Sequence, residues 1–176
     1  MTDLGSAPLP PLVDDDHVRG VPDAPLVIEY ADFECHFCAV ADARLARVPV
    51  RRVFRHFPMR SKHPRAWACA CAAEAAARQG RFWELHDSLY ADPGRLEDPH
   101  LWQRARDLDL DLDRFQADRH SAEVATRVRR DFEAGIRAGV VTTPTLFVKG
   151  EPHPGIPDHA LLKQLTTDDS EPATSD

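Results

Sequence analysis

The apolar positions of the chain form runs that predict strands and spaced patterns that predict helices. A nearly continuous apolar run over residues 26–31, interrupted by Glu29, suits a central strand covered on both faces. From Cys35 the spacing becomes helical, until Pro49 stops it. The run over residues 50–57 then predicts a second strand, which ends at the next proline.

The next eighty or so residues are helical in pattern. N-cap residues and first-turn prolines mark the starts of the segments, and glycines mark several of the ends. Apolar side chains recur on one face of each segment. The pattern predicts helices over residues 63–80, 82–90, 98–108 and 121–139.

The C-terminal part returns to strands. A short strand over residues 145–148 follows Thr143-Pro144, and a further strand is expected near 151–156 and a helix near 158–165. The order is therefore β-α-β, a helical block, and β-β-α. It predicts an α/β fold with a mixed sheet flanked by helices and a helical domain inserted between the second and third strands.

These patterns divide the chain into one core and one insertion. Residues 18–58 and 140–166 are expected to form the core, and residues 59–139 the helical insertion. Residues 1–17 carry several prolines and three consecutive aspartates, and residues 167–176 form a polar, acidic tail. Both ends are predicted to be disordered.

Composition and charge exclude several classes of partner. A chain of 176 residues with 43% hydrophobic residues can form one domain with a real core. The net charge of −7 argues against nucleic acid and anionic membranes as partners. Basic residues do gather over residues 51–56, but they alternate with apolar ones, which we interpret as a strand with solvated arginines.

The start of the chain and the apolar runs predict the compartment. The first residues show no basic segment followed by an apolar one, and no apolar run approaches the roughly 18 residues of a membrane span. We therefore expect a soluble, cytoplasmic protein. Structural disulfides are rare there, so a cysteine pair indicates catalysis or metal binding.

Cys35 and Cys38 lie at the junction of the first predicted strand and helix. Unpaired N–H groups and the helix dipole favour an anion at this end, which lowers the pKa of a thiol placed there. Cys35 would then attack a disulfide, and Cys38, one turn further on, would resolve the mixed disulfide. His36 would add positive charge when protonated, although the same helix end disfavours the imidazolium, and Phe37 offers a small apolar surface.

Two other interpretations of the cysteines remain open: zinc binding and packing as small apolar side chains. Cys69 and Cys71 would complete a four-cysteine zinc site with the first pair, but two positions apart on a helix they point away from each other. We interpret them as small apolar fillers, and we expect no metal and no cofactor. Most of the other histidines show no ligand spacing: His17, His86, His100, His120, His153 and His159.

Glu29 and Thr143-Pro144 complete the candidate site. A carboxylate within an apolar strand is costly to bury without a partner, and its position six residues before Cys35 would set it beneath Cys38 as a proton acceptor. The alternative is a strand at the sheet edge with its carboxylate in water. Pro144 belongs at the first residue of a strand or in a turn, and the sequence does not decide whether its peptide bond is cis or trans.

Five segments resemble the DsbA-like thiol:disulfide oxidoreductases of the thioredoxin superfamily, in particular bacterial members without a signal peptide. They stand in the family's order and cover about residues 16–165: "DHVRGVPDAPLVIEYADFECHFC", "VFRHFPMRSKHP", "AAEAAARQGRFWELHDSLY", "DLDLDRFQAD" and "AGVVTTPTLFVKG". A CxxC motif after "DFE" combined with a downstream "TPT" is specific. The resemblance implies a thioredoxin fold with an inserted helical domain.

The resemblance also implies roles for the candidate residues. Cys35 would be the exposed nucleophile, Cys38 its buried partner, and Glu29 the acid beneath them. Thr143-Pro144 would be a cis-proline loop that presents backbone groups to an extended substrate peptide. Two aromatic residues would border the same groove: Phe33 and Phe37.

The chain also departs from the family pattern. His36 stands where members often carry proline, so the redox poise is not carried over. The expected function is a cytoplasmic thiol:disulfide oxidoreductase that acts on protein thiols, with a glutathione or thioredoxin system to recycle it. A thioredoxin-like binding module without turnover and a zinc-binding structural protein are the alternatives.

Overall fold

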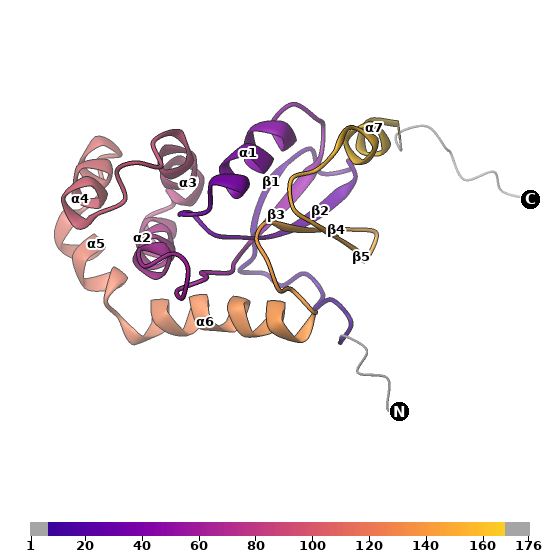
Figure 1. Cartoon of the computed structure of the whole chain (residues 1–176). Helices are drawn as coiled ribbons and strands as arrows, with labels where there is room; N and C mark the ends of the chain where they lie inside the picture. The colour runs from indigo at the N-terminus through magenta and orange to yellow at the C-terminus, as the bar shows by residue number, and fades with distance from the viewer. Residues whose placement is uncertain (1–6, 168–176) are drawn as a thin grey trace, which may run out of the picture.

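The computed structural model describes residues 7–167, which contain five strands and seven helices (Figure 1). The strands are β1 (His17–Gly20), β2 (Leu26–Ala31), β3 (Arg51–His56), β4 (Thr145–Val148) and β5 (Glu151–Pro154). The helices are α1 (His36–Leu45), α2 (Ala66–Ala77), α3 (Phe82–Ala91), α4 (Asp98–Asp107), α5 (Leu112–Arg119), α6 (Ala122–Arg137) and α7 (His159–Thr167).

The strands form one mixed sheet in the order β1-β3-β2-β4-β5. β2 and β3 are parallel, and the other neighbouring pairs are antiparallel. The predicted α/β class and the β-α-β, helical block, β-β-α order are confirmed. β1 was not predicted, because a four-residue edge strand with half of its side chains exposed has too little apolar pattern to be recognised. It ends at Gly20, where φ is +103° and an added Cβ would lie 2.0 Å from the Val50 carbonyl oxygen.

Helices cover both faces of the sheet (Figure 1). On one face Val27 and Leu146 pack with Leu45 of α1 and Leu161 of α7. On the other face a cluster that includes Tyr30 packs against α6. Because both faces are covered, the residues of β2 after Leu26 are buried, as the continuous apolar run predicted.

The helical insertion, α2 to α6, shares its core with the sheet. Phe54 of β3 belongs to the same cluster as Leu85, Leu101 and Phe115 from the insertion. The insertion is therefore packed into the protein and does not hang from it. α5 was not predicted. Its N-cap residue is Asp111, whose side chain accepts a hydrogen bond from the backbone N–H of Arg114 at 3.0 Å.

The segment before β1 corrects the expectation of disorder over residues 1–17. The N–H of Ala7 donates to the Arg137 carbonyl oxygen at 2.8 Å, and Leu9 and Leu12 pack on the sheet face that α6 covers. Residues 7–17 therefore lie against the core. The rest of that segment and residues 168–176 of the predicted acidic tail lie outside the described residues.

The expectation of solvated arginines on β3 was wrong. Arg52, Arg55 and His56 are 4%, 3% and 1% exposed. Each buried cation or imidazole has an acidic partner: Glu29 for Arg52, Asp16 for Arg55 and Glu74 for His56. Alternation of charged and apolar residues signals an exposed face only where such partners are absent.

No helix within residues 7–167 combines the length and the apolar composition needed to cross a bilayer.

The contact between α6 and the sheet gives a first prediction. A Cβ added at Gly135 would lie 2.7 Å and 2.9 Å from ring atoms of Phe57 and Tyr30, both buried. We expect Gly135→Ala to lower the free energy of unfolding by about 1–3 kcal/mol, because neither ring has room to move. Urea denaturation measures this.

The matched control is Gly94→Ala. A Cβ there would meet one side-chain oxygen of Asp92, at 3.8 Å. Alanine at this position should leave stability unchanged or raise it by up to about 1 kcal/mol. Equal effects of the two substitutions would contradict the packing of α6 described here.

Candidate active site

Cys35 is the N-cap residue of α1, and Cys38 lies one turn further along the helix. Cys35 has extended backbone angles and no side-chain hydrogen bond caps the helix. Its N–H donates to the Asp32 carbonyl oxygen at 3.1 Å, and its own carbonyl oxygen accepts from the N–H of Cys38 at 3.0 Å. Both cysteines are present as free thiols. The predicted position at the first turn of the helix is therefore observed.

The surroundings of Cys35 favour its thiolate. The largest cause is a hydrogen bond from the Cys38 thiol, which lowers the pKa of Cys35, whereas burial raises it. The Thr143 side chain and the backbone N–H groups of Cys38 and Phe37 add further hydrogen bonds. Together they lower the pKa of Cys35 to about 5.

Cys38 shows the opposite behaviour. It is fully buried, and burial raises its pKa well above the ordinary value of a thiol. The neighbouring Cys35 and the charge of Glu29 raise it further. The pair therefore consists of one acidic and one weakly acidic thiol, as a nucleophile and a resolving residue require.

The loop before β4 covers Cys35. The Thr143–Pro144 peptide bond is cis, and the Cys35 Sγ lies 3.4 Å from the Thr143 carbonyl oxygen, to which the thiol donates. The Pro144 carbonyl oxygen accepts from the N–H of Gly155 at 2.7 Å. Cys35 is only 5% exposed, which differs from the exposed nucleophile that the resemblance implied.

Two apolar side chains close in sequence to this contact are exposed. Phe37 is 59% exposed and Val141 is 80% exposed, each within two residues of the contact between Cys35 and Thr143. His36 is also exposed, with its ring 6.1 Å from that of Phe37. Val141 was not singled out from the sequence; its position two residues before the TPT segment was the available signal.

Phe33 does not border this surface, contrary to the expectation. It is 1% exposed, and its ring stacks on Phe54 with centroids 5.1 Å apart. Tyr90 packs on it at 5.2 Å. The short turn between β2 and α1 directs Phe33 into the core that the insertion shares, so its contribution is to packing.

Glu29 is fully buried in β2, which excludes the alternative of a carboxylate in water at a sheet edge. Its Oε2 accepts from Arg52 Nη2 at 2.7 Å, and Arg52 Nη1 donates to Asp42 at 2.8 Å. Oε1 makes no hydrogen bond within the described part of the chain. Because the charge of Glu29 acts on Cys38, the carboxylate lies within electrostatic reach of the buried thiol.

Asp32 holds the turn that carries Cys35, although sequence reasoning did not single it out. It is 2% exposed, and its carboxylate accepts from the N–H of Glu34, the N–H of Met59 and Nδ1 of His63, each at 2.8 Å. Its position in "DFE" before the cysteines was the signal. The carboxylate links the active-site turn to the segment that leads into the insertion.

The four cysteines do not form a zinc site. Cys69 and Cys71 are buried in α2, and burial raises the pKa of Cys69 to about 12 and that of Cys71 to about 11. Within residues 7–167, no group of three or more potential metal ligands includes a cysteine. Their interpretation as apolar fillers fits this environment.

Comparison with curated proteins finds relatives that are much longer than this chain. Na⁺/H⁺ antiporter NhaA 3 of Salinispora tropica is 45% identical over 148 residues, which cover 81% of this chain and 23% of that protein. Na⁺/H⁺ antiporter NhaA of Herminiimonas arsenicoxydans is 42% identical over 142 residues, or 77% of this chain and 22% of that protein. The chain thus spans about a quarter of the length of the curated relatives it matches.

Solved structures share the fold over nearly the whole chain. A thioredoxin-like oxidoreductase from Silicibacter pomeroyi superposes with a TM-score of 0.77 at 26% identity and covers 87% of this chain and 91% of that one. α-DsbA1 of Wolbachia pipientis gives 0.72 at 21% identity, covering 88% and 90%, and BdbD of Bacillus subtilis gives 0.75 at 19%, covering 91% and 95%. The last two similarities show the fold alone.

The sequence model of the family described as Thioredoxin matches residues 13–166, from the segment before β1 to α7. With this match over most of its length, and with the CxxC pair at the start of α1, the chain belongs to the thioredoxin family.

Proposed function

We propose that the chain is a thiol:disulfide oxidoreductase that acts on protein thiols and disulfides through Cys35. The observation that carries the proposal is geometric: Cys35 is the N-cap residue of α1, Cys38 lies one turn further on, and the cis Thr143–Pro144 loop contacts the Cys35 sulfur at 3.4 Å. The family and the solved thioredoxin-like oxidoreductase support the same chemistry.

The reaction proceeds through a mixed disulfide. The Cys35 thiolate attacks one sulfur of a substrate disulfide, forms an S–S bond with it and releases the other substrate sulfur as a thiolate. Cys38 then loses its proton and attacks Cys35 Sγ, and the second substrate sulfur leaves. Two electrons pass to the substrate, and the cysteine pair becomes a disulfide. Run in reverse, the same steps oxidise a substrate dithiol.

Glu29 is proposed as the group that accepts the Cys38 proton. Cys38 is fully buried, so bulk water cannot reach its thiol directly. The Glu29 carboxylate is buried with it and has one oxygen, Oε1, that is not bonded to Arg52. A carboxylate in this position is a general base for resolution and a general acid for the reverse step.

The proposed substrate is an extended segment of a protein. It would lie beside the loop at Thr143-Pro144, with Phe37 and Val141 as apolar contacts. His36, when protonated, would add positive charge beside the thiolate. We propose the cytoplasm as the compartment and a glutathione or thioredoxin system as the recycling partner. The proposed function does not extend to the part of the antiporter relatives that this chain does not match, about three-quarters of their length.

The acidity of Cys35 indicates the redox poise. A stabilised thiolate favours the reduced pair and makes the disulfide more oxidising. Thioredoxin, with a cysteine pKa of about 7, has a potential of about −270 mV, and each pKa unit corresponds to about 30 mV for two electrons. The lowered pKa of Cys35 therefore predicts a potential less negative than about −270 mV.

The test of the function is equilibration with glutathione buffers, read by thiol trapping. We expect one two-electron transition with a midpoint less negative than about −270 mV, because Cys35 and Cys38 form the redox pair. Cys35→Ser should abolish this transition. Cys71→Ser is the matched control and should preserve it, because Cys71 is buried in α2 with a raised pKa. Absence of the transition in the unaltered protein would favour a binding module without turnover.

A second prediction concerns the thiolate itself. The rate of Cys35 alkylation by iodoacetamide should rise with pH around an inflection near 5. Cys38→Ala removes the largest cause of this acidity, so the inflection should move up by at least about one unit toward the ordinary value of about 8.5. An inflection above about pH 8 in the unaltered protein would exclude the proposed nucleophile.

A third prediction separates Glu29 from Cys35. Glu29→Gln should slow release of a mixed disulfide by at least about tenfold at neutral pH, because the buried thiol loses its proton acceptor. Alkylation of Cys35 should keep its rate. Stopped-flow measurement of the preformed mixed disulfide gives the first rate. Glu34→Gln is the control, since Glu34 bonds Arg65 near the surface, and equal slowing by both substitutions would remove Glu29 from the mechanism.

A further inference from the structure

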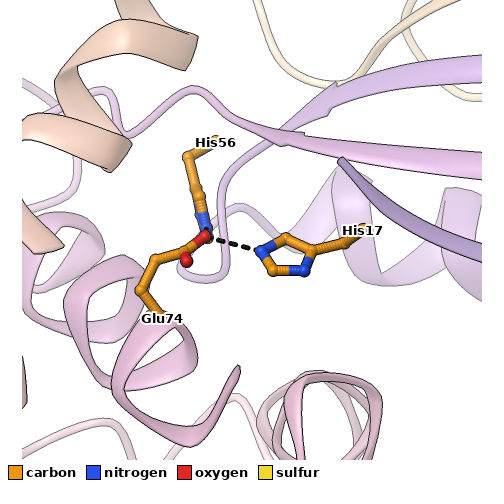
Figure 2. Close-up of side chains that lie close together, drawn as sticks. All are labelled: His17, His56 and Glu74. Atoms are coloured by element: carbon orange, nitrogen blue, oxygen red, sulfur yellow. Dashed lines mark hydrogen bonds and ion pairs between the residues drawn. The ribbon is translucent and has the colours of Figure 1, made fainter. Parts of the chain in front are cut away.

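His17, His56 and Glu74 meet between the sheet and the insertion (Figure 2). Glu74 Oε1 lies 2.6 Å from Nε2 of His17 and 2.7 Å from Nε2 of His56. Potential ligand atoms of the three residues all lie within 4.8 Å of one another. β1 pairs with β3 in a register that sets His17 opposite Phe54, near the end of β3 that carries His56, and α2 brings Glu74 to the same place. Sequence spacing gave no sign of this cluster.

We propose that these three side chains form a binding site for a divalent transition-metal ion, with Zn²⁺ as the expected occupant. Two imidazoles and one carboxylate are a ligand set that binds zinc in proteins, with the remaining positions left to water or another ligand. The site is separate from the cysteines, because none of them belongs to the cluster.

The local chemistry is compatible with the change from hydrogen bonds to metal bonds. A carboxylate only accepts hydrogen bonds, so both imidazoles donate from Nε2 in the arrangement observed. On binding, the proton of each imidazole moves to Nδ1, and the Nε2 lone pair turns to the ion; Nδ1 of the buried His56 has no hydrogen-bond partner within the described residues, which is a cost of binding. Tetrahedral zinc places its ligand atoms about 3.3 Å apart, so the separations of 2.6 Å and 2.7 Å must widen by less than 1 Å.

The surroundings hold the ligands in position. The His17 ring stacks on Phe82 with centroids 3.4 Å apart and planes 7° apart. The His56 ring is 1% exposed and stands edge-on to Phe54 at 5.3 Å. Each residue comes from a different element: β1, β3 and α2. Two packed rings and a carboxylate, drawn from three elements, form a largely pre-organised site, which lowers the cost of ordering ligands on binding.

Access and charge also suit a cation. A cavity of about 290 Å³ is lined by His17 and Glu74, with Asp15 and Glu123 among its other walls. Arg127 Nε lies 4.0 Å from Glu74 Oε1 and opposes a cation. Arg127 is itself paired with Asp131 and, at 3.4 Å, with Asp15, so acidic side chains offset its charge.

Calorimetric titration with ZnCl₂ tests the site. The background is the full chain with Cys35→Ser and Cys38→Ser, which removes the proposed redox pair as competing metal ligands. We expect one ion per chain, and His17→Gln should weaken its binding by at least about tenfold. His159→Gln, which changes an exposed histidine at the start of α7, is the control and should bind as the background does. No binding in the background, or equal binding after His17→Gln, would overturn the proposal.

A second measurement needs no change in the cluster, in case His17→Gln does not fold. Co²⁺ is added to the same background, and the ring signals of all histidines are followed by NMR. One equivalent should broaden or shift the signals of His17 and His56 and leave that of His159 unchanged. Broadening that begins at other histidines would show surface binding and would also overturn the proposal.

Discussion

The antiparallel pairing of β2 with β4 is the constraint on which the candidate site depends. β2 leads directly into the turn that carries Cys35, and Thr143-Pro144 leads directly into β4. The pairing places Tyr30 opposite Thr145, so the end of one strand meets the start of the other. Two residues 108 positions apart in sequence thereby come into contact, Cys35 Sγ with the Thr143 carbonyl oxygen.

That pairing also contributes to the difference in acidity between Cys35 and Cys38. The end of the strand pair supplies Thr143 beside Cys35, and the first turn of α1 supplies backbone N–H groups to the same sulfur. Cys38 points toward the sheet, where there is no solvent and where the charge of Glu29 disfavours a second anion. The two acidities therefore have different causes: hydrogen bonds, the largest of them from the Cys38 thiol, lower the pKa of Cys35, whereas burial raises the pKa of Cys38.

Much of this arrangement was accessible from the sequence, and what was missed has a common origin. The continuous apolar run of β2, the prolines and the cysteine spacing are local signals, and they predicted the order of elements from β2 onward along the chain and the position of the cysteines at the junction of strand and helix. The partners of Arg52 and Arg55, by contrast, are Glu29 and Asp16, far away in sequence. A charged residue can be placed in a core only when its partner is known, so the strand β3 was wrongly interpreted as solvated.

The same reasoning applies to Phe33 and to the disorder expected for the first residues. The family resemblance placed Phe33 at a groove, but its direction is set by the core of the insertion, which local pattern does not show. Residues 7–17 are rich in proline, yet Arg55 binds the carbonyl oxygens of Pro10 and Pro11 at 3.2 Å and 2.9 Å. A proline-rich segment is ordered when its carbonyl groups find a buried donor.

The insertion therefore belongs to the machinery that positions the site. Asp32 accepts from Met59 and His63, which lead into α2, and the Tyr90 hydroxyl of α3 donates to the Asp32 carbonyl oxygen at 3.4 Å. That carbonyl oxygen also accepts from the N–H of Cys35. Because backbone of the turn is bonded to the insertion, a shift of α3 or of the segment before α2 must move the first turn of α1. The acidity of Cys35 depends on the placement of that turn, so the helical insertion and the sheet jointly determine the chemistry of the sulfur.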